Sequence, residues 1–271
     1  MEKIGLFAGV GILPVEFVRA AKKAGYTVVV IAVVPDVAPE LEKEADVYYQ
    51  ISVAKLNKVI QTMKKEGVTN VTMIGKVTKE VLFKGLVLPD FRTLKVLASL
   101  HNRKDDTIML ALVEELAKDG LTVVDQTKYL KALLPKEGVL SEMQPTAAAL
   151  ADMRFGFRMA KAIGGFDIGQ TVVVKKLAVM AVEAIEGTDA CIRRGGQLAR
   201  EAGVVVKVAK PNQDWRFDMP TVGKNTILSM IESNCNVLAI EAEKTLFVEQ
   251  EEVNMLARKH HICICAITED M

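Results

Sequence analysis

The sequence is short of cysteine, proline and aromatic residues, and each shortage excludes a class of protein. Four cysteines in 271 residues are too few for a disulfide scaffold, and no histidine lies at a spacing that would complete a zinc site. A reducing compartment is expected. Eight prolines, spread along a chain that is 50% hydrophobic, exclude a disordered protein. The chain is long enough to bury a sizeable core in each of two domains.

The chain also lacks an excess of charge and a long apolar run. Thirty-five basic against 34 acidic residues give a net charge of +1, and the few aromatics are not interleaved with basic residues, which argues against a nucleic-acid partner. The longest strongly apolar run, 28–34, is far shorter than the roughly 20 residues of a spanning helix. The apolar stretch 4–14 follows Glu2 and is interrupted by glycines, unlike a signal peptide. We expect a cytoplasmic protein without a transmembrane segment.

Alternating strand and helix patterns predict an α/β fold. A buried strand at 3–8, an amphipathic helix at 14–24 and a β-branched strand at 27–33 form a βαβ unit. Such alternation predicts a mostly parallel sheet with helices on both faces. Further elements expected in this half are helices at 53–66 and 107–119, the latter opened by Thr107 as its cap, and strands at 71–74 and 121–124.

A stretch without periodicity separates the two halves. Residues 133–145 contain two prolines and a Lys-Glu-Gly turn signal, so we expect a linker there, between an amino-terminal domain at 1–132 and a carboxy-terminal α/β domain at 146–271. The elements expected in the second domain are helices at 147–163, 196–202, 225–234 and 250–259 and strands at 171–175, 177–182, 204–209, 237–241 and 262–267. Cys263 and Cys265 alternate in the last strand, which predicts two structural thiols on one side of it.

Two motifs in the first half are candidate ligand sites. Gly9 and Gly11 lie in a turn between a strand and a helix, where backbone N–H groups can hold a phosphate. The turn is not a dinucleotide fingerprint, because Pro14 stands where the third glycine belongs, and a turn without ligand is the alternative. Gly75 and Lys76 follow a strand at the sheet edge where open α/β sheets bind ligands, so Lys76 is expected to meet a phosphate or hydroxyl. A surface lysine is equally compatible with the spacing.

Two adjacent carboxylates, Asp105 and Asp106, precede the helix expected at 107–119. The helix dipole favours negative charge at this place, so capping alone explains the pair. The functional alternative is binding of ribose hydroxyls or a metal.

The second half holds two denser clusters. The first supplies oxygen ligands and phosphate partners, as metal-assisted phosphate chemistry requires, although surface salt bridges would use the same residue types. Its members are Glu183, Glu186, Thr188, Asp189, Arg193 and Arg194. The second is the loop 210–220, where Lys210, Asp218 and two further ionised side chains accompany the single tryptophan and two prolines. A loop so rich in charge predicts function, with a salt-bridged surface loop as the alternative.

Four segments carry a resemblance to a known family. They are Gly9-Val-Gly11-Ile-Leu-Pro14, Asp167-Ile-Gly-Gln170, Val182-Glu183-Ala-Ile-Glu186-Gly-Thr188-Asp189-Ala and Arg216-Phe-Asp218-Met-Pro220-Thr221-Val-Gly223. With them, essentially the whole chain resembles the LpxI-type UDP-2,3-diacylglucosamine diphosphatases. The resemblance implies a Rossmann-like amino-terminal domain, a second α/β domain and a ligand cleft between them. It also implies Mg²⁺-dependent hydrolysis to UMP and 2,3-diacylglucosamine 1-phosphate on the route to lipid A, with Asp218 as the catalytic aspartate.

These expectations combine into one mechanism. Asp218, with Glu183 and Asp189, would hold Mg²⁺ and the attacking water. Arg193, Lys210 or Lys76 would stabilise phosphoryl oxygens, and the turn at 9–11 would meet the nucleotide. The partner is a lipid-bearing nucleotide sugar, with peripheral contact at the inner membrane face and self-association left open. The competing hypotheses are a nucleotide or nucleotide-sugar binding protein that uses the glycine turn, either an oxidoreductase or a non-catalytic sensor.

Overall fold

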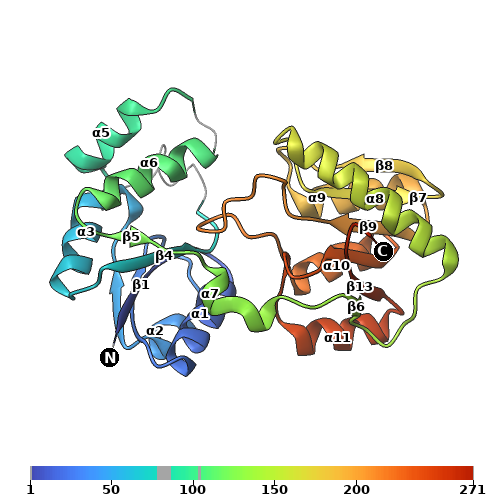
Figure 1. The fold of residues 1–271 in the computed structure, drawn as a ribbon, viewed down its shortest axis with the longest axis horizontal. Coiled ribbons are helices and arrows are strands. Elements are labelled where there is room, and N and C mark those ends of the chain that lie inside the picture. Colours follow the sequence, from blue (N-terminus) through green and yellow to red (C-terminus); the bar gives the residue numbers. More distant parts are fainter. Residues whose placement is uncertain (1, 78–86, 103–104, 271) are drawn as a thin grey trace. The chain divides into compact units, whose positions relative to one another are not determined.

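The computed structural model describes residues 2–77, 87–102 and 105–270 (Figure 1). The chain forms two compact units. The first comprises Met1–Leu130 together with Trp215–Phe217, and the second comprises Lys131–Asp214 and Asp218–Met271. None of the described helices is both long and apolar enough to cross a bilayer.

The first unit is built on a five-stranded parallel sheet of order β3-β2-β1-β4-β5. Its strands are β1 (Lys3–Ala8), β2 (Thr27–Ala32), β3 (Val47–Gln50), β4 (Asn70–Ile74) and β5 (Thr122–Val123). From β1 the chain moves outward to β3 and then returns to add β4 on the other side of β1. The strand order therefore reverses between β1 and β4, as in a Rossmann-like sheet, which confirms the predicted fold class.

Helices cover both faces of this sheet. They are α1 (Leu13–Lys23), α2 (Glu40–Glu44), η1 (Val53–Lys55), α3 (Leu56–Lys65), α5 (Phe91–Ser99), α6 (Asp105–Ala117) and α7 (Thr127–Leu130). Side chains of α3, α5 and α6 share a core with Phe7, Val29 and Ile31 on one face, whereas α1 and α7 pack together through the rings of Phe17 and Tyr129. The central strands are apolar throughout because they are buried on both sides.

Most elements of the first unit agree with the sequence patterns, but three points differ. The helix expected at 107–119 begins at Asp105, so Thr107 lies inside α6 and its predicted role as the cap is wrong. The helix expected at 53–66 is split, since Ser52 caps a short 3-10 turn before α3 starts. Two elements were not predicted from the sequence. They are β3, which is an edge strand of the sheet, and α5, which Asp90 caps by accepting a hydrogen bond from Thr93 N.

The second unit contains a mixed six-stranded sheet of order β6-β13-β11-β9-β7-β8. The strands are β6 (Gly138–Val139), β7 (Thr171–Lys175), β8 (Ala178–Val182), β9 (Gly203–Lys207), β11 (Cys235–Glu241) and β13 (Cys263–Ile267), and β10 (Thr221–Val222) pairs separately with β12 (Leu246–Phe247). The central strands β9, β11 and β13 are parallel, while β7 runs antiparallel to β9 and β6 antiparallel to β13. The predicted linker thus contains β6.

Two layers of helices sandwich this sheet. On one face lies α8 (Ala147–Gly165), and on the other lie α9 (Thr188–Ala199), α10 (Lys224–Glu232) and α11 (Gln250–Lys259). Glycines allow α8 and α9 to pack closely on the sheet. A Cβ on Gly156 of α8 would lie 2.6 Å from Val206, and a Cβ on Gly195 of α9 would lie 2.4 Å from Val173. The short helix expected at 196–202 is wrong, because those residues include the end of the longer α9, which begins at Thr188 and stops before Arg200.

The two cysteines of β13 are buried, as predicted. Cys263 and Cys265 point to the same side of the strand, in the core beneath α8, and their Sγ atoms are 3.6 Å apart. They act there as small apolar side chains.

Candidate functional site

The predicted glycine turn lies at the carboxyl ends of β1 and β4. Val10 and Lys76 exchange two backbone hydrogen bonds of 2.9 Å each, which bring the two strand ends together. A Cβ on Gly9 would lie 2.7 Å from the backbone of Gly75, and a Cβ on Gly75 would lie equally close to Gly9. Close backbone packing therefore explains both glycines.

Gly11 has a different requirement. Its φ of +119° is one that L side chains rarely adopt, although the space around it is open. The turn sits where the strand order reverses, which is the place where open α/β sheets bind ligands. The structure thus gathers Gly9, Gly11, Gly75 and Lys76 at one point of the first unit, and their contact with a nucleotide stays a prediction.

A buried glutamine that was not predicted as a site residue holds the segment 215–217 in the first unit. Gln126 is 2% exposed. Its Nε2 donates to Met73 O at 2.8 Å and to Arg216 O at 2.9 Å, and its backbone N donates to Trp215 O at 3.2 Å. No local pattern marks this residue, because its partner carbonyls are 53 and 90 residues away.

In the second unit, the charged loop around Asp218 is organised by specific contacts. Gln213 Nε2 donates to Asp218 Oδ2 at 2.6 Å. Lys210 Nζ lies 3.6 Å from the same oxygen and 2.9 Å from Asp167 Oδ1. The Asp218 side chain keeps 36% of its surface exposed, so a substrate can reach it. Lys210 and Asp218, predicted together in the loop 210–220, therefore lie beside Asp167.

A second chain of contacts starts in the turn before α9. Thr188, the first residue of that helix, donates from Oγ1 to Glu183 Oε1 at 2.8 Å, and Glu183 Oε2 accepts from Gln170 N at 3.2 Å. The Thr188 hydroxyl also accepts from Lys207 Nζ at 3.1 Å. Lys207 is buried, and it had no predicted role.

The three predicted metal ligands act electrostatically on this lysine. Burial lowers the pKa of the Lys207 ammonium, while the charges of Glu183, Asp189 and Asp218 act in the opposite direction. Lys207, at the carboxyl end of β9, therefore stands in the field of all three carboxylates.

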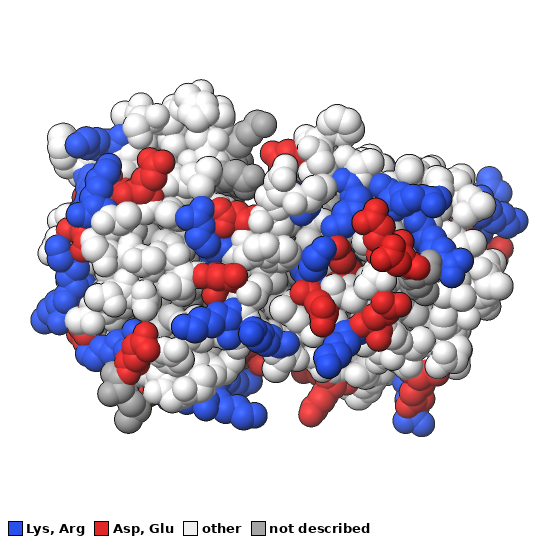
Figure 2. All heavy atoms as spheres, viewed as in Figure 1, with Lys and Arg blue, Asp and Glu red and all other residues white. Residues whose placement is uncertain are grey.

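Other predicted residues make surface ion pairs. Arg193 Nε lies 2.6 Å from Glu232 Oε2, with both side chains about half exposed, and Arg194 pairs with Glu186. Figure 2 shows acidic and basic side chains interspersed over the face that it draws, in keeping with the balanced charge. Asp105 and Asp106 open α6, but their side chains lie outside the described part of the structure.

Among the side chains that the structure describes, which leave out those of Asp105 and Asp106, no three of His, Cys, Asp or Glu come close enough to hold a metal ion. Mg²⁺ does not require such a group, because it is commonly bound by one or two carboxylates together with substrate phosphates. The partly exposed Asp218 fits that arrangement. The set of Asp218, Glu183 and Asp189 stays a prediction.

Comparisons with known proteins identify the family. The model of the LpxI N-terminal domain matches residues 3–133, and the model of the LpxI C-terminal domain matches residues 136–265. The chain belongs to the LpxI family. A curated relative, the UDP-2,3-diacylglucosamine pyrophosphatase LpxI of Caulobacter vibrioides (strain ATCC 19089 / CIP 103742 / CB 15), is 31% identical over 264 residues, which cover 93% of each chain.

Solved structures share much less with this LpxI-family chain. The biotin carboxylase subunit of pyruvate carboxylase matches with a TM-score of 0.27 and 15% identity, covering 64% of this chain and 35% of its own. N5-carboxyaminoimidazole ribonucleotide synthetase from Thermotoga maritima matches with a TM-score of 0.27 and 15% identity, covering 69% and 42%. The family assignment rests on the sequence matches alone.

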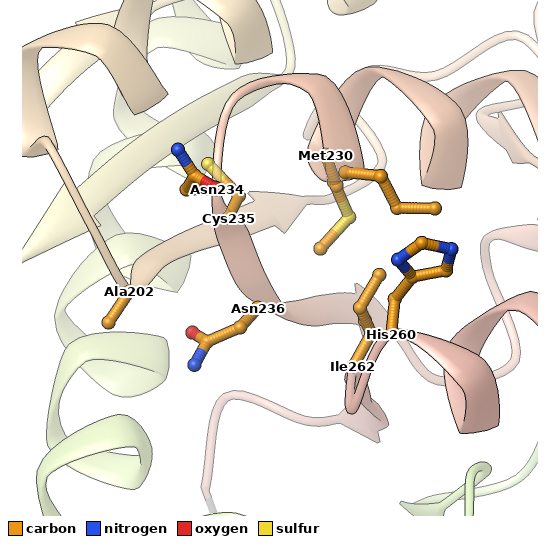
Figure 3. Close-up of a pocket in the computed structure, with 8 residues that line it drawn as sticks. Ala202, Met230, Asn234, Cys235, Asn236, His260 and Ile262 are labelled. Atoms are coloured by element: carbon orange, nitrogen blue, oxygen red, sulfur yellow. The ribbon is translucent and has the colours of Figure 1, made fainter.

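The second unit also contains a cavity of about 270 Å³, which lies away from Lys207 (Figure 3). Its lining includes Ala202, Cys235 and Ile262, which stand at or just before the amino ends of β9, β11 and β13. Asn234, Asn236 and His260 also contribute to it. Lys207 is the last residue of β9, whereas the cavity lies at the amino ends of the strands, so the cavity is separate from Lys207 and the carboxylates that act on it.

Proposed function

We propose that this chain hydrolyses the diphosphate of UDP-2,3-diacylglucosamine to UMP and 2,3-diacylglucosamine 1-phosphate, in lipid A biosynthesis. The curated relative that carries this activity in its name aligns over 93% of both chains. We place the reaction at Asp218, because its carboxylate is partly exposed and is held between Gln213 and Lys210.

Hydrolysis of a diphosphate needs its charge neutralised, a water oriented and the leaving group held in line. In this proposal Asp218 orients the attacking water through its carboxylate oxygens. Gln213 fixes the aspartate by its hydrogen bond to Oδ2. Lys210 supplies positive charge to a phosphoryl oxygen from a position 3.6 Å from that oxygen of Asp218.

Magnesium is part of the proposal. Asp218 would hold it on the protein side, with Glu183 and Asp189 as further proposed ligands, and bound Mg²⁺ would supply charge neutralisation at the diphosphate. Arg193 keeps its proposed role as a phosphate partner, for which it would have to leave its exposed pair with Glu232.

We assign the nucleotide-binding site to the first unit. The turn at 9–11 lies at the carboxyl ends of β1 and β4, where the strand order reverses. Lys76 stands at the same place and would meet a phosphate or ribose hydroxyl. The competing hypothesis of a nucleotide-binding protein without catalysis rests on this same turn.

The acylated substrate favours work at a membrane surface from the cytoplasmic side. Helix α5 and the residues before it carry large apolar side chains that face solvent, among them Leu88, Phe91 and Leu94, which are 81%, 83% and 51% exposed. Exposed apolar side chains gathered in one place mark contact surfaces. We assign this α5 surface, defined by these three residues, to the lipid.

The test is release of UMP from UDP-2,3-diacylglucosamine by the purified protein, with Mg²⁺ and then with chelator. Unacylated UDP-glucosamine serves as the control substrate. We expect metal-dependent UMP release from the acylated substrate alone, and a loss of about 100-fold or more in kcat for Asp218→Asn, which preserves shape but removes the charge. Tight nucleotide binding without turnover under any condition would favour the binding-protein hypothesis.

A further inference from the structure

A buried lysine stands at the carboxyl end of β9, beside the residues of the proposed reaction. Lys207 is 7% exposed. Lysine is rarely so buried, because its ammonium group loses hydration and must find partners inside the protein. The partners that Lys207 finds belong to the segments that the proposed chemistry uses.

The ammonium group joins three segments of the chain. Lys207 Nζ donates to Thr188 Oγ1 at 3.1 Å, in the first turn of α9, and to the backbone oxygen of Thr221 at 2.9 Å, where β10 begins. The first contact continues from Thr188 to the carboxylate of Glu183. One side chain therefore fixes the end of β9, the start of α9 and the start of β10.

The contact with Thr221 bears on Asp218, which lies three residues earlier. Gln213 holds Asp218 itself through its side chain and backbone oxygens. Lys207 holds the other end of the short segment 218–221. The position of the Asp218 carboxylate therefore depends on an anchor at each end of this segment.

We propose that Lys207 is a positioning residue of the hydrolysis, which sets the places of Asp218 and of the α9 amino terminus without touching the substrate. This inference rests on the proposed function. A misplacement of about 1 Å at a reacting group costs about 100-fold in rate, so the loss of this anchor reduces turnover more than binding.

The chain offers a matched control on the neighbouring strand β7, next to the amino end of β9. Lys175 is also largely buried, with 19% of its side chain exposed, and its Nζ donates to two backbone oxygens, of Ala199 at 3.0 Å and Glu201 at 2.6 Å. Lys175→Met removes the same kind of contacts as Lys207→Met. It leaves the carboxyl end of β9 intact, because β7 runs antiparallel to β9.

The first measurement is steady-state kinetics of both variants with the acylated substrate, beside their thermal unfolding. We expect Lys207→Met to lower kcat by about 100-fold with KM changed by less than about threefold, and Lys175→Met to keep kcat within about threefold. Equal losses of kcat in the two variants, or a normal kcat in a folded Lys207→Met protein, would overturn the proposal.

A double-mutant cycle separates positioning from a general loss of stability. Thr188→Val removes the hydroxyl that Lys207 contacts. If the lysine acts partly through Thr188, the effects of Lys207→Met and Thr188→Val on kcat/KM combine to less than their product. If the two effects on kcat/KM simply multiply, Lys207 does not act through Thr188 and the amino terminus of α9.

Hydrogen exchange tests the structural role of Lys207 independently of the reaction. In Lys207→Met, we expect faster exchange of the amides in the first turns of α9 and in 218–222, with α8 and α11 unchanged. Unchanged exchange in both segments would refute the positioning role whatever the activity. A wild-type protein that releases no UMP, but shows the expected exchange, would refute the reaction and retain the anchor.

Discussion

At the scale of single residues, the glycine turn shows how two neighbouring glycines can be required for different reasons. Gly9 is needed for space and Gly11 for its backbone conformation. We therefore expect Gly9→Ala to destabilise the first unit by about 1–3 kcal/mol through overpacking against Gly75. Urea unfolding would measure this. Gly165→Ala is the control, since its Cβ would meet nothing closer than 3.9 Å, and an equal loss there would contradict the packing explanation.

The thiols give a second prediction at this scale. All four cysteines are buried, and burial raises the pKa of Cys191 to about 12. A disulfide reagent must reach a thiol to react with it, so we expect none of the four buried cysteines to react at pH 8 in the folded protein. All four should react after unfolding in urea. Rapid modification of a folded sample would show that one of these core positions opens.

At the scale of elements, an ion-pair network links α5 to α6. Arg92 Nε lies 2.6 Å from Glu115 Oε1 and also pairs with Asp119. Lys118 and then Arg92 hold the pKa of Glu115 below its usual value, and Lys64 and then Arg92 do the same for Asp119. Because the folded-state pKa values are depressed, the stabilisation is complete above the unfolded-state values and is lost as pH falls through the folded-state ones.

We therefore expect Asp119→Asn to lower stability at pH 7 by about 1 kcal/mol, a value discounted for partial solvent exposure. The difference from wild type should shrink as pH falls below about 5. Unfolding by urea at pH 7, 5 and 3 measures this, with the exposed Asp36→Asn as the surface control. A difference that stayed constant down to pH 3 would contradict the ionic explanation.

The α5 surface gives a prediction about membranes. Replacing Phe91 and Leu94 together by serine removes two exposed apolar side chains, so we expect binding to anionic phospholipid vesicles to fall about tenfold or more, with unchanged thermal stability. Vesicle sedimentation measures this. Met255→Ser, at a similarly exposed apolar residue of α11, should bind as wild type does. Normal binding of the double variant would place lipid contact elsewhere.

At the scale of the whole molecule, the single tryptophan lies in a three-residue segment that groups with the first unit, although the residues on either side of the segment belong to the second. Trp215 groups with residues 1–130, and Gln126 holds this segment. Gln126→Leu removes the hydrogen bonds that Nε2 donates to the carbonyls of Met73 and Arg216, at a cost of about 1–3 kcal/mol. We expect a changed tryptophan emission in the folded protein. Gln50→Leu, which also removes two bonds to carbonyls, should leave the emission unchanged.

The same scale shows what sequence reasoning could reach. Strands β1 and β2 were predictable because their apolar runs are local. The charge of the loop 210–220 singled out that segment, whereas the role of Asp218 came from the family resemblance and stays a prediction. Lys207 was not predictable, since it ends an apolar strand and its partners Thr188 and Thr221 are 19 and 14 residues away. The start of α6 was misplaced because Thr107 follows two aspartates that suit a first helical turn equally well.

The grouping of Trp215–Phe217 with the first unit also bears on how this gene can be recombined. A chimera that joins the amino-terminal half of one relative to the carboxy-terminal half of another would combine Gln126 of one protein with residues 215–217 of the other. Exchanges that carry residues 215–217 along with the first half would keep that contact. The first compact unit is therefore encoded by two separate stretches of the gene, although the two family domains follow one another along the chain.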